Sequence, residues 1–343
     1  MRPLVVQQSF PDPRPTSNPY IALLAGALGG LSGVEVRTFS WPRALLRRAD
    51  VFHAHWPEIL VSGNGRLKTG VRQALFVLLL LRLRLSRTAV VRTVHNLELP
   101  SGLSLVQRVL LARFDRIVDL RIALNEDTPF AEGVPQAVVP HGHYREWFAR
   151  HDEPATIPGR FGYFGLIRRY KNVGGLVEAF RGLTGQVTLE VAGAPSSPDL
   201  VAEIEAQAQA DPRVRLRFEY LSDEDLVGVA GRAEMIVLPY SHMHNSGGVL
   251  AALSLDRPVL VPATPTNARL SHEVGPGWVF QFDGDLDRHD LEQALLDRRS
   301  ASFEARPDLS ARDWSASAAL HEKAYRRAVR IRRVRTGFAM PPE

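Results

Sequence analysis

The chain has 343 residues, of which 45% are hydrophobic and 23% charged, with no cysteine and a formal net charge of +5. This length suits two domains better than one core, and the composition is that of a globular protein, not of a disordered, collagen-like or coiled-coil chain. The absence of cysteine excludes disulfides, thiolate metal sites and a thiol nucleophile, and it is compatible with a cytoplasmic location.

Short apolar runs alternate with helical patterns along the chain. In the first part we predict strands at 4–7, 34–39, 51–55, 89–94, 121–124 and 137–139, and helices at 18–31, 66–85 and 105–118. In the second part we predict strands at 160–165, 186–193, 214–218, 235–239, 259–261 and 278–282, and helices at 173–183, 198–210, 223–230 and 248–254. Strands separated by helices indicate parallel sheets with right-handed crossovers. The expected fold class is therefore α/β, with two doubly wound domains.

The domain boundaries follow from a polar, proline-containing segment at 151–158. We expect an N-terminal domain at 1–150, a second domain at 151–310, and a helical segment at 311–335 that could cross back to the first domain. Two facing domains of this class hold their ligand in the cleft between the carboxyl ends of their strands. The apolar run at the N-terminus is too short for a signal peptide, and no apolar block approaches the ~20 residues of a membrane span.

The charge is concentrated in the first domain. Residues 1–150 carry 19 Lys and Arg against 11 Asp and Glu, whereas the remainder carries 23 against 26. Between Ile59 and Leu97 there is no acid, and basic residues interleave with leucines. This pattern favours an anionic membrane surface over nucleic acid, with a core helix that has solvated ends as the alternative. The residues expected to face the membrane are Arg66, Lys68, Arg72, Arg82, Arg84 and Arg87, and a basic tail at 323–335 is expected to help.

Three predicted strands of the first domain end in histidine-bearing segments: HAHWPE at 53–58, HN at 95–96 and HGHY at 141–144. Imidazoles at one sheet edge suit hydroxyl recognition and proton transfer. Glu58 is the first candidate for a general base because a carboxylate beside Trp56 can have its pKa raised. His95 is the second candidate, and His53, inside a strand, is expected to be packed. Structural roles for Glu58 and for any single histidine remain the alternatives.

The second domain carries two candidate anion-binding turns. FGLIRRYK places Gly165, Arg168 and Lys171 between a strand and a helix, where basic groups can hold a diphosphate. HNSGG places Asn245, Ser246 and Gly247 at the start of an apolar helix, whose free N–H groups favour an anion. An exposed basic loop and a simple N-cap are the alternatives. There is no GxGxxG or P-loop, and His-x-His pairs without a further ligand predict no metal site.

Several segments, in order along the chain, resemble glycosyltransferase family 94 of the GT-B superfamily, whose founding member acts in xanthan repeat-unit assembly. They include HWPE at 55–58, VVRTVHN at 90–96, HGHYREWF at 141–148, FGLIRRYK at 164–171, MHNSG at 243–247 and EVGPGWVF at 273–280. The resemblance implies a metal-independent, inverting β-mannosyltransferase that uses GDP-mannose and a polyprenyl-diphosphate-linked oligosaccharide in exopolysaccharide biosynthesis. A lipid-linked acceptor, together with the basic clusters, leads us to expect a cytoplasmic protein peripherally associated with the inner face of the cell membrane.

Site roles are assigned on these motifs. The catalytic candidates are Glu58 and His95; the donor-binding residues are Gly165, Arg168, Lys171, Asn245, Ser246, Gly247 and His143; the acceptor-binding residues are Asn18, Tyr20, His55, Trp56 and Asn96. The Glu-x7-Glu pair of retaining family 4 is absent, since Met243 and Ala251 stand there, so that family's donor contacts are not transferred. Another nucleotide sugar, such as UDP-glucuronate or UDP-glucose, or a different glycan acceptor is one alternative. A non-catalytic nucleotide-sugar-binding protein is the other.

Overall fold

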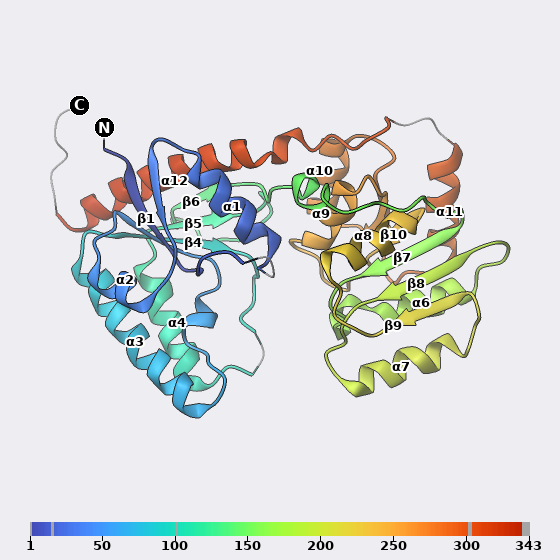
Figure 1. Cartoon of the computed structure of the whole chain (residues 1–343), viewed down its shortest axis with the longest axis horizontal. Coiled ribbons are helices and arrows are strands. Elements are labelled where there is room, and N and C mark those ends of the chain that lie inside the picture. Colours follow the sequence, from blue (N-terminus) through green and yellow to red (C-terminus); the bar gives the residue numbers. More distant parts are fainter. Residues whose placement is uncertain (1, 15–16, 101, 301–303, 338–343) are drawn as a thin grey trace. The chain divides into compact units, whose positions relative to one another are not determined.

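The computed structural model describes residues 2–14, 17–100, 102–300 and 304–337, and the chain divides into two compact units (Figure 1). The first unit comprises the residues up to Gly142 together with those from Arg312 onward, and the second is His143–Ala311. The division therefore falls eight residues before the expected boundary at 150. The segment HYREWF at 143–148, which follows the last strand of the first unit, belongs to the second unit.

The first unit is built on a parallel six-stranded sheet in the order β2-β1-β3-β4-β5-β6. Its elements are β1 (Leu4–Gln8), α1 (Pro19–Gly29), β2 (Val34–Arg37), α2 (Trp41–Leu46), β3 (Val51–Ala54), the 3-10 helix η1 (Pro57–Leu60), α3 (Arg66–Leu85), β4 (Ala89–Val94), α4 (Leu105–Ile117), β5 (Leu120–Ala123), β6 (Gln136–Val138) and α12 (Trp314–Arg335). After β1 the chain adds β2 on one side of β1. It then returns to add β3, β4, β5 and β6 in turn on the other side of β1. The strand order therefore reverses between β1 and β3, which is where open α/β sheets place their ligands.

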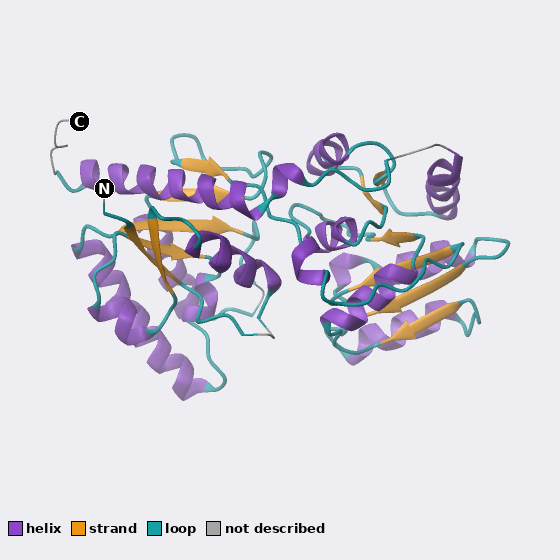
Figure 2. Ribbon diagram, turned by 45° about the horizontal axis from the view of Figure 1, so that its top comes forward, coloured by secondary structure: helices purple, strands orange, loops and turns teal. Residues whose placement is uncertain are grey.

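Helices cover both faces of this sheet, as Figure 2 shows. On one face, α1 and α12 form a core that includes Leu24, Leu28 and Tyr325. On the other face, α2, α3 and α4 form a core that includes Phe76 and Phe114. Strands buried on both faces account for the short, continuous apolar runs in the sequence.

The C-terminal helix α12 completes the first unit. The Trp314 ring at its start packs so closely on Gly142 that a Cβ there would lie 2.4 Å from it. Near its end, buried Arg332 donates hydrogen bonds to the carbonyls of Arg84 (3.1 Å), in the last turn of α3, and of Ser86 (2.9 Å), its C-cap. Because its guanidinium is used in this way, Arg332 is not part of a membrane-facing basic tail. The last turn of α12 is thus fixed to the first unit.

The second unit is also a parallel six-stranded α/β layer, in the order β12-β11-β10-β7-β8-β9. Its elements are α5 (Arg145–Phe148), β7 (Arg160–Phe164), η2 (Arg169–Lys171), α6 (Val173–Arg181), β8 (Thr188–Ala192), α7 (Pro198–Ala208), β9 (Val214–Arg217), α8 (Asp223–Arg232), β10 (Met235–Val237), α9 (Gly247–Ser254), β11 (Val259–Pro262), α10 (Pro265–Val274), β12 (Val279–Phe282) and α11 (Arg288–Ser300), with η3 (Ser310–Arg312) at its end. Here the strand order reverses between β7 and β10. The α/β prediction is confirmed for both units, and none of the described helices is long and apolar enough to span a bilayer.

Candidate functional site

In the second unit, glycines end the neighbouring strands β7 and β8. Gly165 has a φ of +107°, and its N–H donates to the carbonyl of Ala192 at 3.1 Å. Gly193 lies against it so closely that a Cβ at Gly193 would be 1.8 Å from the Gly165 carbonyl oxygen. Only residues without side chains fit this contact, which leaves the backbone open at the carboxyl edge of the sheet. Sequence reasoning selected Gly165 and missed Gly193, although Gly193 also directly follows a buried strand.

The chain after Gly165 carries the two predicted basic residues. Arg168 precedes η2 and is exposed. Lys171 ends η2, and its Nζ lies 4.8 Å from the centroid of the Tyr240 ring. Burial, and then repulsion from Arg168, lower the pKa of Lys171 to about 8. Among the described residues neither side chain has a carboxylate partner, so a bound anion would supply the missing counter-charge.

Tyr240 joins this turn to the second predicted anion-binding turn. It follows β10, and its hydroxyl is hydrogen-bonded to the Ser246 side chain at the N-terminus of α9. The backbone N–H of Ser241 donates to the Tyr170 carbonyl at 2.7 Å, which ties the two loops directly. The loops after β7 and β10 therefore meet where the strand order reverses, as the two predicted turns require.

The start of α9 has the features of an anion-binding helix end. Ser246 is the N-cap, and its Oγ accepts from the Val249 N–H at 3.3 Å. Gly247 and Gly248 leave this turn without bulky side chains, and Asn245 lies half-buried directly before the cap. The Ser246 side chain satisfies the N–H of Val249. The N–H groups of Gly247 and Gly248, which precede Val249 in the first turn, therefore remain for a ligand.

His143 begins the second unit and is buried near this helix. Its Nδ1 accepts from the Arg145 N–H at 3.3 Å, and the N–H of the next residue, Tyr144, donates to the Ser254 hydroxyl of α9 at 2.8 Å. A Cβ at Gly247 would be 3.3 Å from the Tyr144 hydroxyl. The segment of His143 therefore packs along α9, and the structure assigns it to the same unit as the other predicted donor-binding residues.

In the first unit, the switch point between β1 and β3 holds a chain of hydrogen-bonded side chains. His95 Nε2 lies 3.2 Å from His55 Nδ1, and His55 Nε2 lies 3.2 Å from Gln8 Oε1. Gln8 Nε2 donates to the Tyr325 hydroxyl at 3.3 Å, and this hydroxyl lies 2.9 Å from His53 Nδ1. The chain runs from the end of β4, through the ends of β3 and β1, to α12.

Proton positions along this chain follow from the orientation of the Gln8 amide. Its Oε1 can only accept, so His55 Nε2 carries the proton and His55 Nδ1 accepts from His95 Nε2–H. His95 is thereby the tautomer with an unprotonated Nδ1. Burial lowers the pKa values of His53, His55 and His95 well below 6.5, and repulsion between neighbouring imidazoles lowers them further. These histidines are neutral at pH 7.

His53 is packed, as the sequence predicts: it is 0% exposed, and its second nitrogen lies 2.8 Å from the Thr93 hydroxyl. Its partner Tyr325 was missed by sequence reasoning, as were Gln8, which bonds Tyr325 and His55, and His321, which lies beside His53 with ring centroids 5.7 Å apart. A glutamine inside a strand and two residues on a helix some 270 positions away gave no local signal of this contact.

Trp56 lies against this network, and Glu58 follows Trp56 two residues later in the chain. The Trp56 indole stacks on His95 with ring centroids 4.0 Å apart and an interplanar angle of 16°. Glu58 occupies the first turn of η1 and is half-buried. Burial raises its pKa, while its own backbone N–H and the charge of Arg92 act in the opposite direction. The structure thus places a carboxylate with a raised pKa on the segment that carries the stacked Trp56.

The predicted acceptor-binding residues differ in exposure. Asn18 is exposed and caps α1 by accepting from the Tyr20 N–H at 3.0 Å. Tyr20 and His55 are each 2% exposed, so their side chains are buried at the carboxyl edge of the first sheet. Asn96, in contrast, is exposed, and Trp56 is half-buried. Trp56 and Asn96 are therefore the members that can contact a ligand without rearrangement. In the part of the chain that the structure describes, no group of three or more His, Asp or Glu side chains is arranged to hold a metal ion.

Comparison with known proteins gives two close sequence relatives. The chain is 39% identical over 327 residues, 95% of its length and 93% of theirs, to two sequences of GDP-mannose:glycolipid 4-beta-D-mannosyltransferase from Xanthomonas campestris pv. campestris. No family model matches the chain.

Solved structures with the same fold are more distant in sequence. The Anabaena protein HepE in complex with UDP and glucose is 15% identical with a TM-score of 0.58, over 97% of this chain and 98% of that one. The catalytic domain of starch synthase IV from Arabidopsis thaliana, bound to ADP and acarbose, is 13% identical with a TM-score of 0.64, over 96% and 100%. At these identities the likeness establishes the fold alone.

Proposed function

The chain belongs to the glycosyltransferase family of the GDP-mannose:glycolipid 4-beta-D-mannosyltransferases and has the GT-B fold, and we propose that it transfers mannose from GDP-mannose to a glycolipid acceptor. The observation that carries this proposal is 39% identity over nearly the full length of both chains. An acceptor of the polyprenyl-diphosphate type and a role in exopolysaccharide biosynthesis belong to the same proposal.

The diphosphate of the donor would be held in the second unit. Lys171 and Arg168 have no carboxylate partners among the described residues, and the N-terminus of α9 is joined to Lys171 through Tyr240. Two cations and a helix N-terminus at one switch point suit a diphosphate, whose charge needs both direct pairing and backbone donors. We expect no metal ion to be required, since these groups neutralise the departing GDP.

Transfer would invert the anomeric carbon by direct displacement. The acceptor hydroxyl oxygen forms a bond to the anomeric carbon as the bond from that carbon to the diphosphate oxygen breaks, and GDP leaves with the electron pair. The hydroxyl proton passes to a base, for which we assign Glu58. A base is most effective when its pKa lies near the working pH; the pKa of Glu58 is raised in that direction, whereas the pKa of His95 is lowered away from it. His95 remains the second candidate.

A peripheral position at the inner face of the membrane would bring the enzyme to a lipid-linked acceptor. Arg66, Lys68 and Arg84 on α3 are exposed and suit this role. Arg72 does not: it donates to the backbone carbonyls of Ile59 and Ser62, so its guanidinium holds the loop before α3.

The test is a donor screen with the purified protein. GDP-mannose, UDP-glucose and UDP-glucuronate are each incubated with lipid-linked oligosaccharide acceptors, and products are read by mass and by the NMR signal of the anomeric proton. We expect a hexose added only from GDP-mannose, with β configuration. Transfer from a UDP-sugar instead would refute the donor assignment, an α product would refute inversion, and nucleotide binding without any transfer would favour a non-catalytic binding protein.

A further inference from the structure

A cavity of the first unit lies at the edge of the sheet opposite to the histidine chain. It has a volume of about 920 Å³, and its lining includes Val5 near the start of β1 and Asp50 and Thr88 directly before β3 and β4. The histidine chain, in contrast, lies at the carboxyl ends of the same strands. A ligand in this cavity is therefore separated by the length of the strands from the proposed base, and it cannot be the reacting group.

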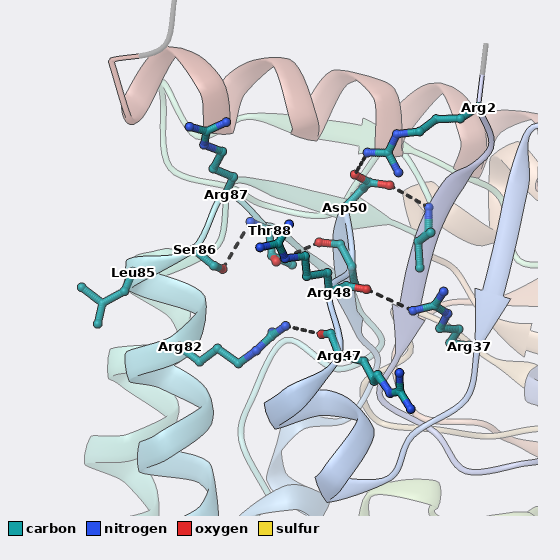
Figure 3. A pocket seen from close by; sticks show the side chains of 12 residues that line it. Arg2, Arg37, Arg47, Arg48, Asp50, Arg82, Leu85, Ser86, Arg87 and Thr88 are labelled. Atoms are coloured by element: carbon teal, nitrogen blue, oxygen red, sulfur yellow. Dashed lines mark hydrogen bonds and ion pairs between the residues drawn. The ribbon is translucent and has the colours of Figure 1, made fainter.

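Arginine dominates the lining, as Figure 3 shows. The six arginines come from five segments of the chain: Arg2, Arg37, Arg47, Arg48, Arg82 and Arg87. Among the described residues, the only carboxylate in the lining is Asp50, which accepts from Arg2 at 2.6 Å and from the Val5 N–H at 2.9 Å. Asp50 is thus already engaged at one side of the cavity.

Three of these arginines lack a carboxylate partner among the residues that the structure describes: Arg47, Arg48 and Arg82. Arg82 donates to the backbone carbonyl of Arg47, and burial lowers its pKa. Of the three, Arg82 is half-buried and Arg47 and Arg48 are exposed. Holding the Arg82 guanidinium partly out of water without a counter-charge is unfavourable, so an anion in this cavity would be stabilised by charge and by bidentate donors. Phosphate has the charge and geometry that such donors match.

An exposed apolar stripe on α3 leads to this cavity. Leu67, Val71, Leu78, Leu81 and Leu85 are each at least half exposed. Their spacing places them on one face of the helix, opposite the face that buries Phe76, Leu79 and Leu83 in the core. The helix is therefore apolar on two faces, and its exposed stripe ends at Leu85, which lines the arginine cavity.

A second hollow extends the cavity along α2. It has a volume of about 500 Å³, shares Arg37 and Arg47 with the first, and is bordered by Leu46, which is 80% exposed. Cationic hollows bordered by exposed leucines on two helices match the boundary of a bilayer, where phosphate lies above acyl chains. A soluble phosphate compound would not require the exposed leucines.

We propose that this arginine pocket binds the phosphate of an anionic phospholipid head group while the exposed stripe of α3 enters the acyl boundary. The proposal deepens the membrane association stated above and rests on it. It adds a discrete binding site in which Arg47 and Arg48, outside α3, join Arg82 of that helix. The site anchors the first unit and takes no part in the chemistry.

The test compares two charge-matched double variants. Arg47→Gln/Arg48→Gln removes two exposed side chains of the pocket, and Arg113→Gln/Arg116→Gln removes two exposed arginines of α4 in the same unit. Binding is measured by co-sedimentation with vesicles of phosphatidylcholine alone and with phosphatidylglycerol added. We expect wild-type protein to bind only the anionic vesicles, the pocket variant to lose about 30-fold in affinity, and the α4 variant to lose much less.

Two further measurements separate the lipid from other sources of phosphate. Leu78→Ser/Leu81→Ser should weaken vesicle binding although it leaves the charge unchanged, and glycerol phosphate at millimolar concentration should compete poorly. Equal losses in the two arginine variants, or none in the pocket variant, would overturn the site. Tight, pocket-dependent binding of glycerol phosphate without vesicles would overturn the lipid assignment. Transfer from GDP-mannose to a detergent-solubilised acceptor is assayed in parallel; its absence would refute the proposed function while vesicle binding still reports on the pocket.

Discussion

Lys171 should make GDP binding depend on pH. In the free protein, burial and repulsion from Arg168 lower its pKa to about 8, whereas an ordinary lysine has a pKa of about 10.4. A diphosphate beside the ammonium favours its charged form and raises the pKa again. Binding therefore takes up a proton at any pH between the two pKa values, and the affinity for GDP falls as the pH rises above 8.

The size of the effect follows from the fraction of charged Lys171. This fraction is about nine-tenths at pH 7 and about one-tenth at pH 9, so the Kd for GDP should rise by roughly tenfold, or ~1.4 kcal/mol. The attraction between the Lys171 ammonium and the diphosphate contributes almost fully at pH 7. This contribution is lost as the pH rises through 8 toward the pKa of the bound state. Isothermal titration calorimetry at both pH values, in buffers with different ionisation enthalpies, measures the affinity and the proton uptake together.

The control is Lys171→Arg, which keeps its charge across this range because the guanidinium pKa exceeds 12. Its affinity for GDP should change little between pH 7 and pH 9. If the wild-type affinity is also constant, Lys171 does not contact the diphosphate. If the arginine variant shows the same tenfold fall, another group titrates and the assignment is wrong.

Three other perturbations have directions that the structure determines. Glu58→Gln should lower turnover by about 10²-fold while calorimetry shows unchanged GDP binding; near-normal turnover would move the base to His95. Lys171→Met should raise the melting temperature of the ligand-free protein at pH 7, because it removes a charge that burial disfavours below pH 8, and it should abolish stabilisation by GDP; a lower melting temperature would contradict this reasoning. Gly193→Ala should lower the urea midpoint strongly, since its Cβ would lie 1.8 Å from the Gly165 carbonyl oxygen; an unchanged midpoint would exclude that contact.

Local patterns in the sequence were sufficient for most of the secondary structure and for locating the two candidate turns of the second unit, whereas α2, α10 and α11 were not among the predicted helices. The helix predicted at 66–85 is α3, with the same bounds, because its apolar residues and flanking breakers are local signals. The turns with Lys171 and Ser246 were recognisable separately, since each follows a buried strand and starts a helix. Their proximity could be inferred because carboxyl ends of parallel strands share one edge of a sheet.

Other features depended on contacts between distant segments. The side chains of Gln8 and Tyr325 join the histidine chain, and Arg332 is used at the end of α3, only because α12 packs on the first sheet. Because of the same packing, Arg332 of the basic segment at 323–335 donates hydrogen bonds within the first unit and is not available to face a membrane. The unpaired arginines of the pocket likewise come from separate segments that strand order brings to one edge.

The physical reason for this division is the range of the interactions involved. Helix and strand periodicity, caps and turns act over a few residues, so the sequence by itself determined the alternating α/β elements, the positions of the two candidate turns and the basic character of the first unit. Whether a basic or polar side chain is buried, paired or left without a counter-charge depends on its partners in space. Those partners were decided by the order of the strands and by the return of α12, which only the tertiary structure supplies.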